Sequence, residues 1–168
     1  MKTIRSKISI FTVAEGDYDN LFLRYISDLY FKSENIFFRP YPRGDMPRGK
    51  QGIINNLHKL RSQYGIEGNK YIGIYDGDGS PRVLSSKDFK LIKINRCLEY
   101  LILKILDIKD CDNYKNSNDI KSFFRKKYKI SNKEDFKIFL SANLTKEKID
   151  KKINKLSDLK EILDIWEI

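Results

Sequence analysis

The sequence predicts an α/β fold in which a mostly parallel, four-stranded sheet is flanked by helices. Three observations support this prediction. Short β-branched and apolar segments alternate with longer segments of helical apolar spacing over residues 7–94. The helical intervals are long enough for right-handed crossovers between parallel strands. The 168 residues, 40% of them hydrophobic, are enough to form one substantial core.

Four segments have the composition of buried strands, and two helices are expected between the first three of them. The strands are expected at residues 7–14, 35–41, 70–75 and 89–94, which are rich in β-branched and aromatic side chains. The helices are expected at about 19–31 and 50–64, where apolar side chains recur every three or four residues. Asp17 or Asp19 can cap the first helix.

The rest of the chain is predicted to be helical. Apolar spacing indicates a helix over about 98–106, followed by shorter helices at 119–128, 146–155 and 158–166. Neither a repeat nor a linker separates these segments from the sheet. We therefore expect a single domain over 1–168, with a core of about 7–107 and a C-terminal helical extension of about 112–168.

Composition excludes several classes of protein. No uncharged apolar run approaches the roughly 18 residues that a membrane span needs, and the first residues have no uncharged stretch typical of a signal peptide. Cys97 and Cys111 have neither C-x-x-C nor Cys/His spacing, so a zinc site or a disulfide framework is not supported. We expect a cytoplasmic protein that does not interact with membranes.

The charge of the chain suggests a polyanionic partner. Its 33 Lys and Arg residues exceed its 23 Asp and Glu residues, which gives a net charge of +10 and a pI near 9.5. Such an excess is typical of proteins that bind nucleic acid. The alternative is a set of solvated lysines in a chain that is simply rich in Lys, Ile and Asn.

Acidic residues follow two of the expected strands. Glu15 comes directly after the first strand, and Asp76 and Asp78 follow the third in a D-G-D-G turn. Ligands of open α/β sheets bind beyond the carboxyl ends of the strands, and glycine allows a backbone to bend tightly enough for neighbouring carboxylates to reach one cation. Mg²⁺, or Mn²⁺ in its place, suits such oxygen ligands together with substrate phosphates. The alternative is that each motif is an ordinary turn, for which Asp and Gly are favoured.

Three segments resemble the Toprim fold, a Rossmann-like catalytic domain shared by topoisomerases, bacterial primases and nucleases of the overcoming-lysogenisation-defect class. The segment V-A-E-G-D-Y-D-N at 13–20 is similar to the family's glutamate motif, and I-G-I-Y-D-G-D at 72–78 is similar to its D-x-D motif. The segment N-R-C-L-E-Y-L-I-L at 95–103 resembles the N-P-C-F-E-L-W-L-L-L signature of the RloB-like branch, with Arg96 in place of proline. The resemblance covers about residues 7–107.

The resemblance implies roles for the acidic residues. Asp76 and Asp78 would bind Mg²⁺, and Glu15 would bind a metal or take part in proton transfer. Glu99 lies on an otherwise apolar helix, so we expect it either to face inward and complete the acidic site or to face solvent. Asp17 and Asp19 are expected to cap a helix or to lie beside the metal ligands.

Basic residues near the same edge of the sheet are candidates for nucleic-acid binding. The primary candidates are Arg39, Arg43, Arg48 and Lys50, in or next to a loop with three of the four prolines; the secondary candidates are Arg82 and Arg96. The loop joins the second strand to its helix, which places it on the same rim as Glu15 and Asp76. An ordinary solvated loop is the alternative.

Two functions from different classes remain open. The resemblance implies a Mg²⁺-dependent nuclease that cleaves phosphodiester bonds of DNA or RNA, in a bacterial defence system. The alternative is a non-catalytic module that binds nucleic acid or a protein partner and works with an ATPase or another subunit. The sequence has no G-x-x-x-x-G-K-[ST] motif, so any ATP dependence would come from a partner. Formation of a homo-oligomer is left open.

Overall fold

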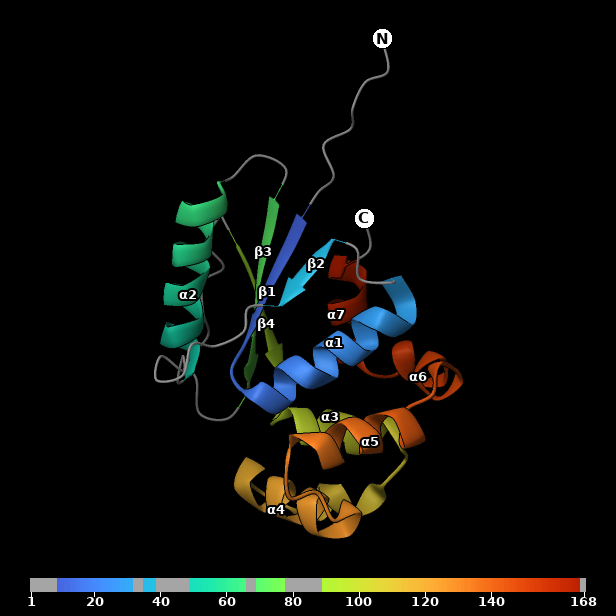
Figure 1. Cartoon of the computed structure of the whole chain (residues 1–168). Coiled ribbons are helices and arrows are strands. Elements are labelled where there is room, and N and C mark those ends of the chain that lie inside the picture. Colours follow the sequence, from blue (N-terminus) through green and yellow to red (C-terminus); the bar gives the residue numbers. More distant parts are fainter. Residues whose placement is uncertain (1–8, 32–34, 39–48, 66–68, 78–88, 167–168) are drawn as a thin grey trace.

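The computed structural model describes residues 9–31, 35–38, 49–65, 69–77 and 89–166, and it confirms the predicted sheet (Figure 1). The four strands are β1 (Ser9–Ala14), β2 (Ile36–Phe38), β3 (Asn69–Asp76) and β4 (Lys90–Ile94). They form one sheet in the order β2-β1-β3-β4, and all three pairings are parallel. Helices connect β1 to β2 and β2 to β3, which is the arrangement that parallel strands require.

Helices make up most of the remaining described chain. They are α1 (Asp17–Phe31), α2 (Gly49–Tyr64), α3 (Leu98–Ile105), α4 (Ser117–Tyr128), α5 (Lys133–Asn143), α6 (Lys146–Ile153) and α7 (Ser157–Trp166), with a short 3₁₀ helix η1 (Lys109–Asn113) before α4. Helix α5 is absent from the sequence prediction. The described part of the chain contains no helix that combines the length and the apolar character needed to cross a membrane.

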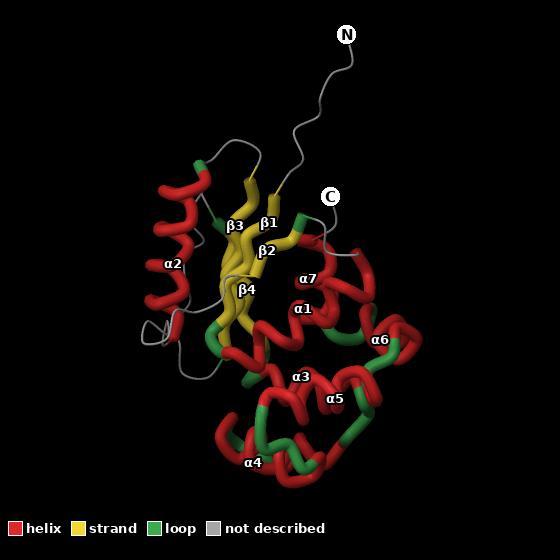
Figure 2. The backbone as a smooth tube through the Cα atoms, in the orientation of Figure 1, coloured by secondary structure: helices red, strands yellow, loops and turns green. Residues whose placement is uncertain are grey.

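The two faces of the sheet are covered unequally (Figures 1 and 2). Helix α2 lies on one face, while α1 and α7 lie on the other, next to the group formed by α3 to α6. Helix α2 packs closely on β3 at Gly73, where a Cβ would come within 2.6 Å of side-chain atoms of both Ile53 and Leu91. The absence of a side chain on Gly73 therefore allows this helix to approach the sheet.

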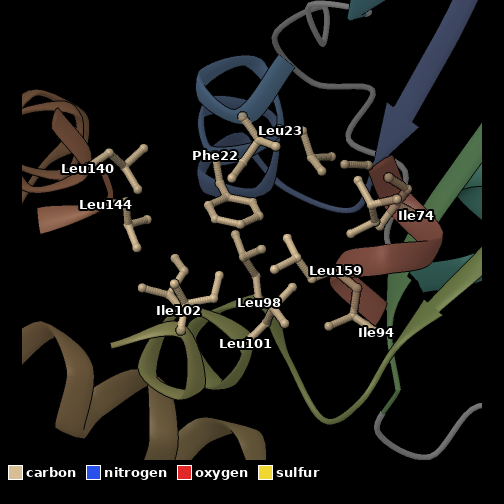
Figure 3. Close-up of a cluster of buried hydrophobic side chains, with 14 of the residues drawn as sticks. Phe22, Leu23, Ile74, Ile94, Leu98, Leu101, Ile102, Leu140, Leu144 and Leu159 are labelled. Atoms are coloured by element: carbon tan, nitrogen blue, oxygen red, sulfur yellow. The ribbon is translucent and has the colours of Figure 1, made fainter. Parts of the chain in front are cut away.

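The larger core lies on the face covered by α1 and α7. Figure 3 shows side chains from four helices meeting the sheet there: Phe22 and Leu23 of α1, Leu98, Leu101 and Ile102 of α3, Leu140 of α5 and Leu159 of α7, near Ile74 and Ile94. Trp166 at the end of α7 is fully buried, and its Nε1 donates a hydrogen bond to Thr12 Oγ1 at 3.3 Å. The C-terminal helices and the sheet thus share one continuous apolar core.

Candidate active site

The carboxyl ends of β1 and β3 bring two predicted site residues together. Glu15 directly follows β1, and Asp76 is the last residue of β3. The two strands are hydrogen-bonded neighbours with Ala14 opposite Ile74. As a result, Glu15 Oε2 accepts a hydrogen bond from the backbone N–H of Asp76 at 3.0 Å. This contact fixes the Glu15 carboxylate at the edge of the sheet where the sequence places a ligand site.

Two further carboxylates complete what we call the acidic site, which consists of Glu15, Asp19, Asp76 and Glu99. Asp19 lies in the first turn of α1, and its Oδ2 is 3.2 Å from the position that a Cβ on Gly16 would occupy. Burial raises the pKa of Asp19 well above its ordinary value, and the negative charges of Asp76 and Glu99 raise it further. Asp19 therefore lies beside the predicted ligands, and since α1 begins at Asp17 it is not the residue that precedes the helix.

Glu99 is the most deeply buried member of the acidic site. Only 6% of the residue is exposed, and its Oε2 has no hydrogen-bond partner among the residues that the structure describes. Burial raises the pKa of this carboxyl group, although the nearby Lys121 ammonium acts in the opposite direction. Of the two orientations that the sequence left open, Glu99 has the inward one. An ionised oxygen without a partner is costly to bury, so this position favours a proton or a cation.

Lys121 supplies a positive charge within the acidic site. Its Nζ lies 2.7 Å from Asp76 Oδ2, and it reaches this carboxylate from α4. Burial alone would lower the pKa of Lys121, but the hydrogen bond to Asp76 and the charges of Asp76 and Glu99 raise it above its ordinary value. Sequence reasoning missed this residue because it is one lysine among many in the helical extension, 45 positions after Asp76.

The turn after β3 packs tightly against the end of β4. Gly77 donates a backbone hydrogen bond to Arg96 O at 3.0 Å, and a Cβ on Gly77 would lie only 2.4 Å from Ile94 O. A glycine is needed here because of this close approach. Cys97 follows as the residue that precedes α3, and its buried thiol has a pKa raised to about 12 by burial and by the charge of Glu99.

The structure describes some of the residues predicted to bind nucleic acid and not others. Arg96 is in the described chain with a left-handed φ of 62°, and its Nη1 donates to Tyr114 O at 2.8 Å while its guanidinium lies 4.7 Å from the ring centre of Tyr100. Lys50 lies in the first turn of α2. The other predicted site residues, Asp78, Arg39, Arg43, Arg48 and Arg82, are outside the described residues.

Asp78, which the sequence predicts to bind metal, lies outside the described residues. Over the ranges that the structure covers, no three His, Cys, Asp or Glu side chains are arranged to hold a metal ion. Asp17 is not part of the acidic site because it forms an ion pair with Lys133 of α5. In the described geometry Lys121 holds the Asp76 carboxylate, and the backbone N–H of Asp76 holds that of Glu15.

We expect the replacement Glu99→Gln to stabilise the protein at neutral pH. The folded state keeps the Glu99 proton to higher pH than the unfolded chain, whose pKa is near the ordinary 4.5. Glu99 therefore destabilises the fold increasingly as pH rises from that value through the raised folded pKa. Glutamine does not ionise, so the variant lacks this destabilisation. Its free energy of unfolding should therefore exceed that of wild type by an amount that grows with pH across that interval.

Urea denaturation at pH values from about 4 to 8 would measure this effect. The matched control is Glu134→Gln, since the side chain of Glu134 is 69% exposed and pairs with Lys137 in the same helix. A difference between Glu99→Gln and wild type that is independent of pH would contradict the assignment.

Comparisons of the chain with protein-family models, with curated proteins and with solved structures gave no match. The functional argument therefore rests on the site itself.

Proposed function

We propose that the protein is a Mg²⁺-dependent nuclease that cleaves phosphodiester bonds at the acidic site. One observation carries the proposal. Glu15 and Asp76 are in contact at the carboxyl edge of a parallel sheet, Asp19 and Glu99 lie near enough for their charges to interact with that of Asp76, and Lys121 pairs with Asp76, in a chain whose overall charge is +10. Acidic side chains can bind the cation that contacts a phosphodiester, while an overall positive charge attracts the nucleic acid that contains it.

The residues of the acidic site supply the type of ligand that a magnesium ion prefers, although no three of the described side chains are arranged to hold one. Carboxylate oxygens are the hard ligands that this ion prefers, and Glu99 Oε2 is buried without a described partner. Burial raises the pKa of both Asp19 and Glu99, and neighbouring carboxylates raise that of Asp19 further; a bound cation would offset both effects. Asp76 and Glu15 already accept one hydrogen bond each, but a carboxylate has about four lone-pair positions and retains the capacity to bind further.

Each residue of the acidic site would have a different role in hydrolysis. A bound Mg²⁺ would polarise the scissile phosphate and lower the pKa of a bound water. Glu15 is positioned by the Asp76 N–H, and Asp76 would hold the cation. Asp19 or Glu99, whose pKa values burial raises above those of ordinary carboxyl groups, would accept or donate the transferred proton. The Lys121 ammonium, 2.7 Å from Asp76 Oδ2, would stabilise charge that develops on the phosphate.

Thermal stability tests metal binding without any assay of cleavage. At a Mg²⁺ or Mn²⁺ concentration a hundredfold above Kd, binding to the folded state contributes about 2.7 kcal/mol, which for a domain of this size raises Tm by about 5–11 °C. We expect Asp76→Asn to lose this rise. Asp107→Asn is the matched control because it also removes a carboxylate paired with a lysine, Lys152, and lies outside the acidic site; it should retain the rise.

A non-catalytic module is the second candidate, and a specific observation favours it. The Lys121 ammonium and the Asp76 N–H already satisfy Asp76 and Glu15 in part, so these residues could serve to join α4 to the sheet. An ATPase or another subunit would then supply the activity. Nucleic-acid binding by a wild-type protein whose Tm does not respond to Mg²⁺ or Mn²⁺ would support this candidate over the nuclease.

A further inference from the structure

A polar and aromatic surface, separate from the acidic site, lies on the side of α4 that faces away from the core. It is a hollow of about 700 Å³ lined by Tyr114, Asp119, Ser122, Phe123, Lys126 and Lys127. We call it the aromatic hollow. These α4 residues recur at helical spacing along one side of the helix, whereas the buried Ile120 and Phe124 lie on the other.

The aromatic hollow combines rings with cations. The rings of Tyr114 and Phe123 have centroids 5.0 Å apart and are tilted by 36°. Lys127 Nζ lies 5.6 Å from the ring centre of Phe123, and Lys126 is exposed beside it. Both rings are only partly buried, so they offer surface on which a further planar group can stack.

Positive charge is concentrated on the segment that carries this hollow. Residues 114–129 contain six basic side chains and one acidic side chain, a net charge of +5. Of the six, Lys126 and Lys127 line the hollow, whereas Lys121 pairs with Asp76 and Arg125 lies over the ring of Tyr18. The acidic one, Asp119, accepts a hydrogen bond from Asn116 Nδ2 at 2.8 Å and lies in the first turn of α4. The surface is therefore suited to a flexible polyanion that also carries aromatic groups.

Contacts connect the aromatic hollow to the acidic site. Arg96 Nη1 donates to Tyr114 O, and Arg96 O accepts from the N–H of Gly77, which adjoins Asp76. On the same helix, Lys121 contacts Asp76 directly. Lys121 projects from another side of α4 than Asp119, Phe123 and Lys126, so a strand bound in the hollow would reach the acidic site by way of Tyr114 and Arg96.

We propose that the aromatic hollow binds single-stranded nucleic acid, with bases stacked on Tyr114 and Phe123 and phosphates against Lys126 and Lys127. Unpaired bases expose the faces that aromatic side chains need, whereas bases in a duplex are already stacked on one another. The inference rests on the proposed function, because it names a single-stranded segment as the substrate class of the acidic site.

A second basic surface provides an internal control. Lys148, Lys151, Lys152 and Lys155 line a hollow of about 380 Å³ together with Ile105, Leu106 and Asp107. No aromatic side chain lines it, so it can offer charge to a phosphate backbone but no stacking surface. The double variant Lys151→Ala/Lys155→Ala removes as much charge as Lys126→Ala/Lys127→Ala.

The test is fluorescence anisotropy with labelled single-stranded DNA, single-stranded RNA and duplex DNA of equal length, in EDTA. We expect wild type to prefer a single strand. Phe123→Leu, which keeps an apolar side chain in place, should weaken single-strand binding about 5- to 150-fold for the loss of one stacked base. Lys126→Ala/Lys127→Ala should make the slope of log K against log salt less steep by about 1.4. Circular dichroism would verify that each variant is folded.

Two outcomes would overturn the inference. One is unchanged single-strand affinity in folded Phe123→Leu. The other is a larger loss in Lys151→Ala/Lys155→Ala than in Lys126→Ala/Lys127→Ala. Because binding is measured without metal, either outcome would leave the metal-induced rise in Tm intact and so can be distinguished from failure of the proposed function.

Discussion

Asp76→Asn is expected to lower metal-dependent cleavage about a hundred- to a thousand-fold. A bound metal stabilises the transition state by several kcal/mol, and each 1.36 kcal/mol corresponds to a factor of ten in rate. Asp76 links the other residues of the acidic site, because its N–H donates to Glu15 and its carboxylate contacts Lys121. Asparagine keeps an oxygen acceptor for Lys121 while removing the negative charge that a cation needs.

Binding and cleavage should separate in this variant. Loss of one negative charge near the phosphate is expected to leave nucleic-acid affinity unchanged or higher, as measured by anisotropy beside a cleavage assay with Mg²⁺ or Mn²⁺. Asp107→Asn, with its own lysine partner outside the acidic site, should cleave at the wild-type rate. Cleavage that persists in both Asp76→Asn and EDTA would assign the activity to another site or to a contaminant.

Trp166→Ala is expected to destabilise the protein by about 3–5 kcal/mol, the range for deletion of a large buried aromatic side chain. Trp166 is fully buried, packs edge-on against Phe31 and Phe38, and donates a hydrogen bond to Thr12 in β1. Its removal therefore leaves a cavity between the last described helix and the sheet.

Urea denaturation followed by circular dichroism and tyrosine fluorescence would measure this loss. Trp166→Phe is the graded control, because it keeps much of the packing and loses the hydrogen bond, worth about 1 kcal/mol. In both variants the two signals should change together, since the helices and the sheet share one core. Transitions of the two signals at different urea concentrations would show that parts of the domain unfold independently.

The sheet could be predicted because its strands carry an unambiguous local signal. Runs such as 71–75 are buried on both faces, as parallel strands covered by helices must be. Helix α5 was missed because only Phe136, Phe139 and Leu140 are buried and Ile138 is 62% exposed, which blurs its apolar period. A capping box between Asn132 and Asp135 marks its start and could have identified it.

The acidic site was predictable only in part, because some of its residues are positioned by local sequence signals and others by tertiary packing. The strand-end rule places Glu15 and Asp76 from sequence, since each follows a recognisable strand. Asp19 and Lys121 depend on how α1 and α4 pack, and no local pattern distinguishes Lys121 from other lysines of the extension. Tertiary packing thus supplies the charge balance of the site.

The position of Cys97 also has a consequence for chemical labelling. Its sulfur is fully buried and, with a pKa of about 12, carries almost no thiolate at neutral pH. Cys111 is likewise buried with a raised pKa. Alkylating reagents act on the thiolate, so the native protein should resist them until its structure opens. A cysteine introduced on the exposed face of α4 would then be modified selectively, without removal of either native thiol.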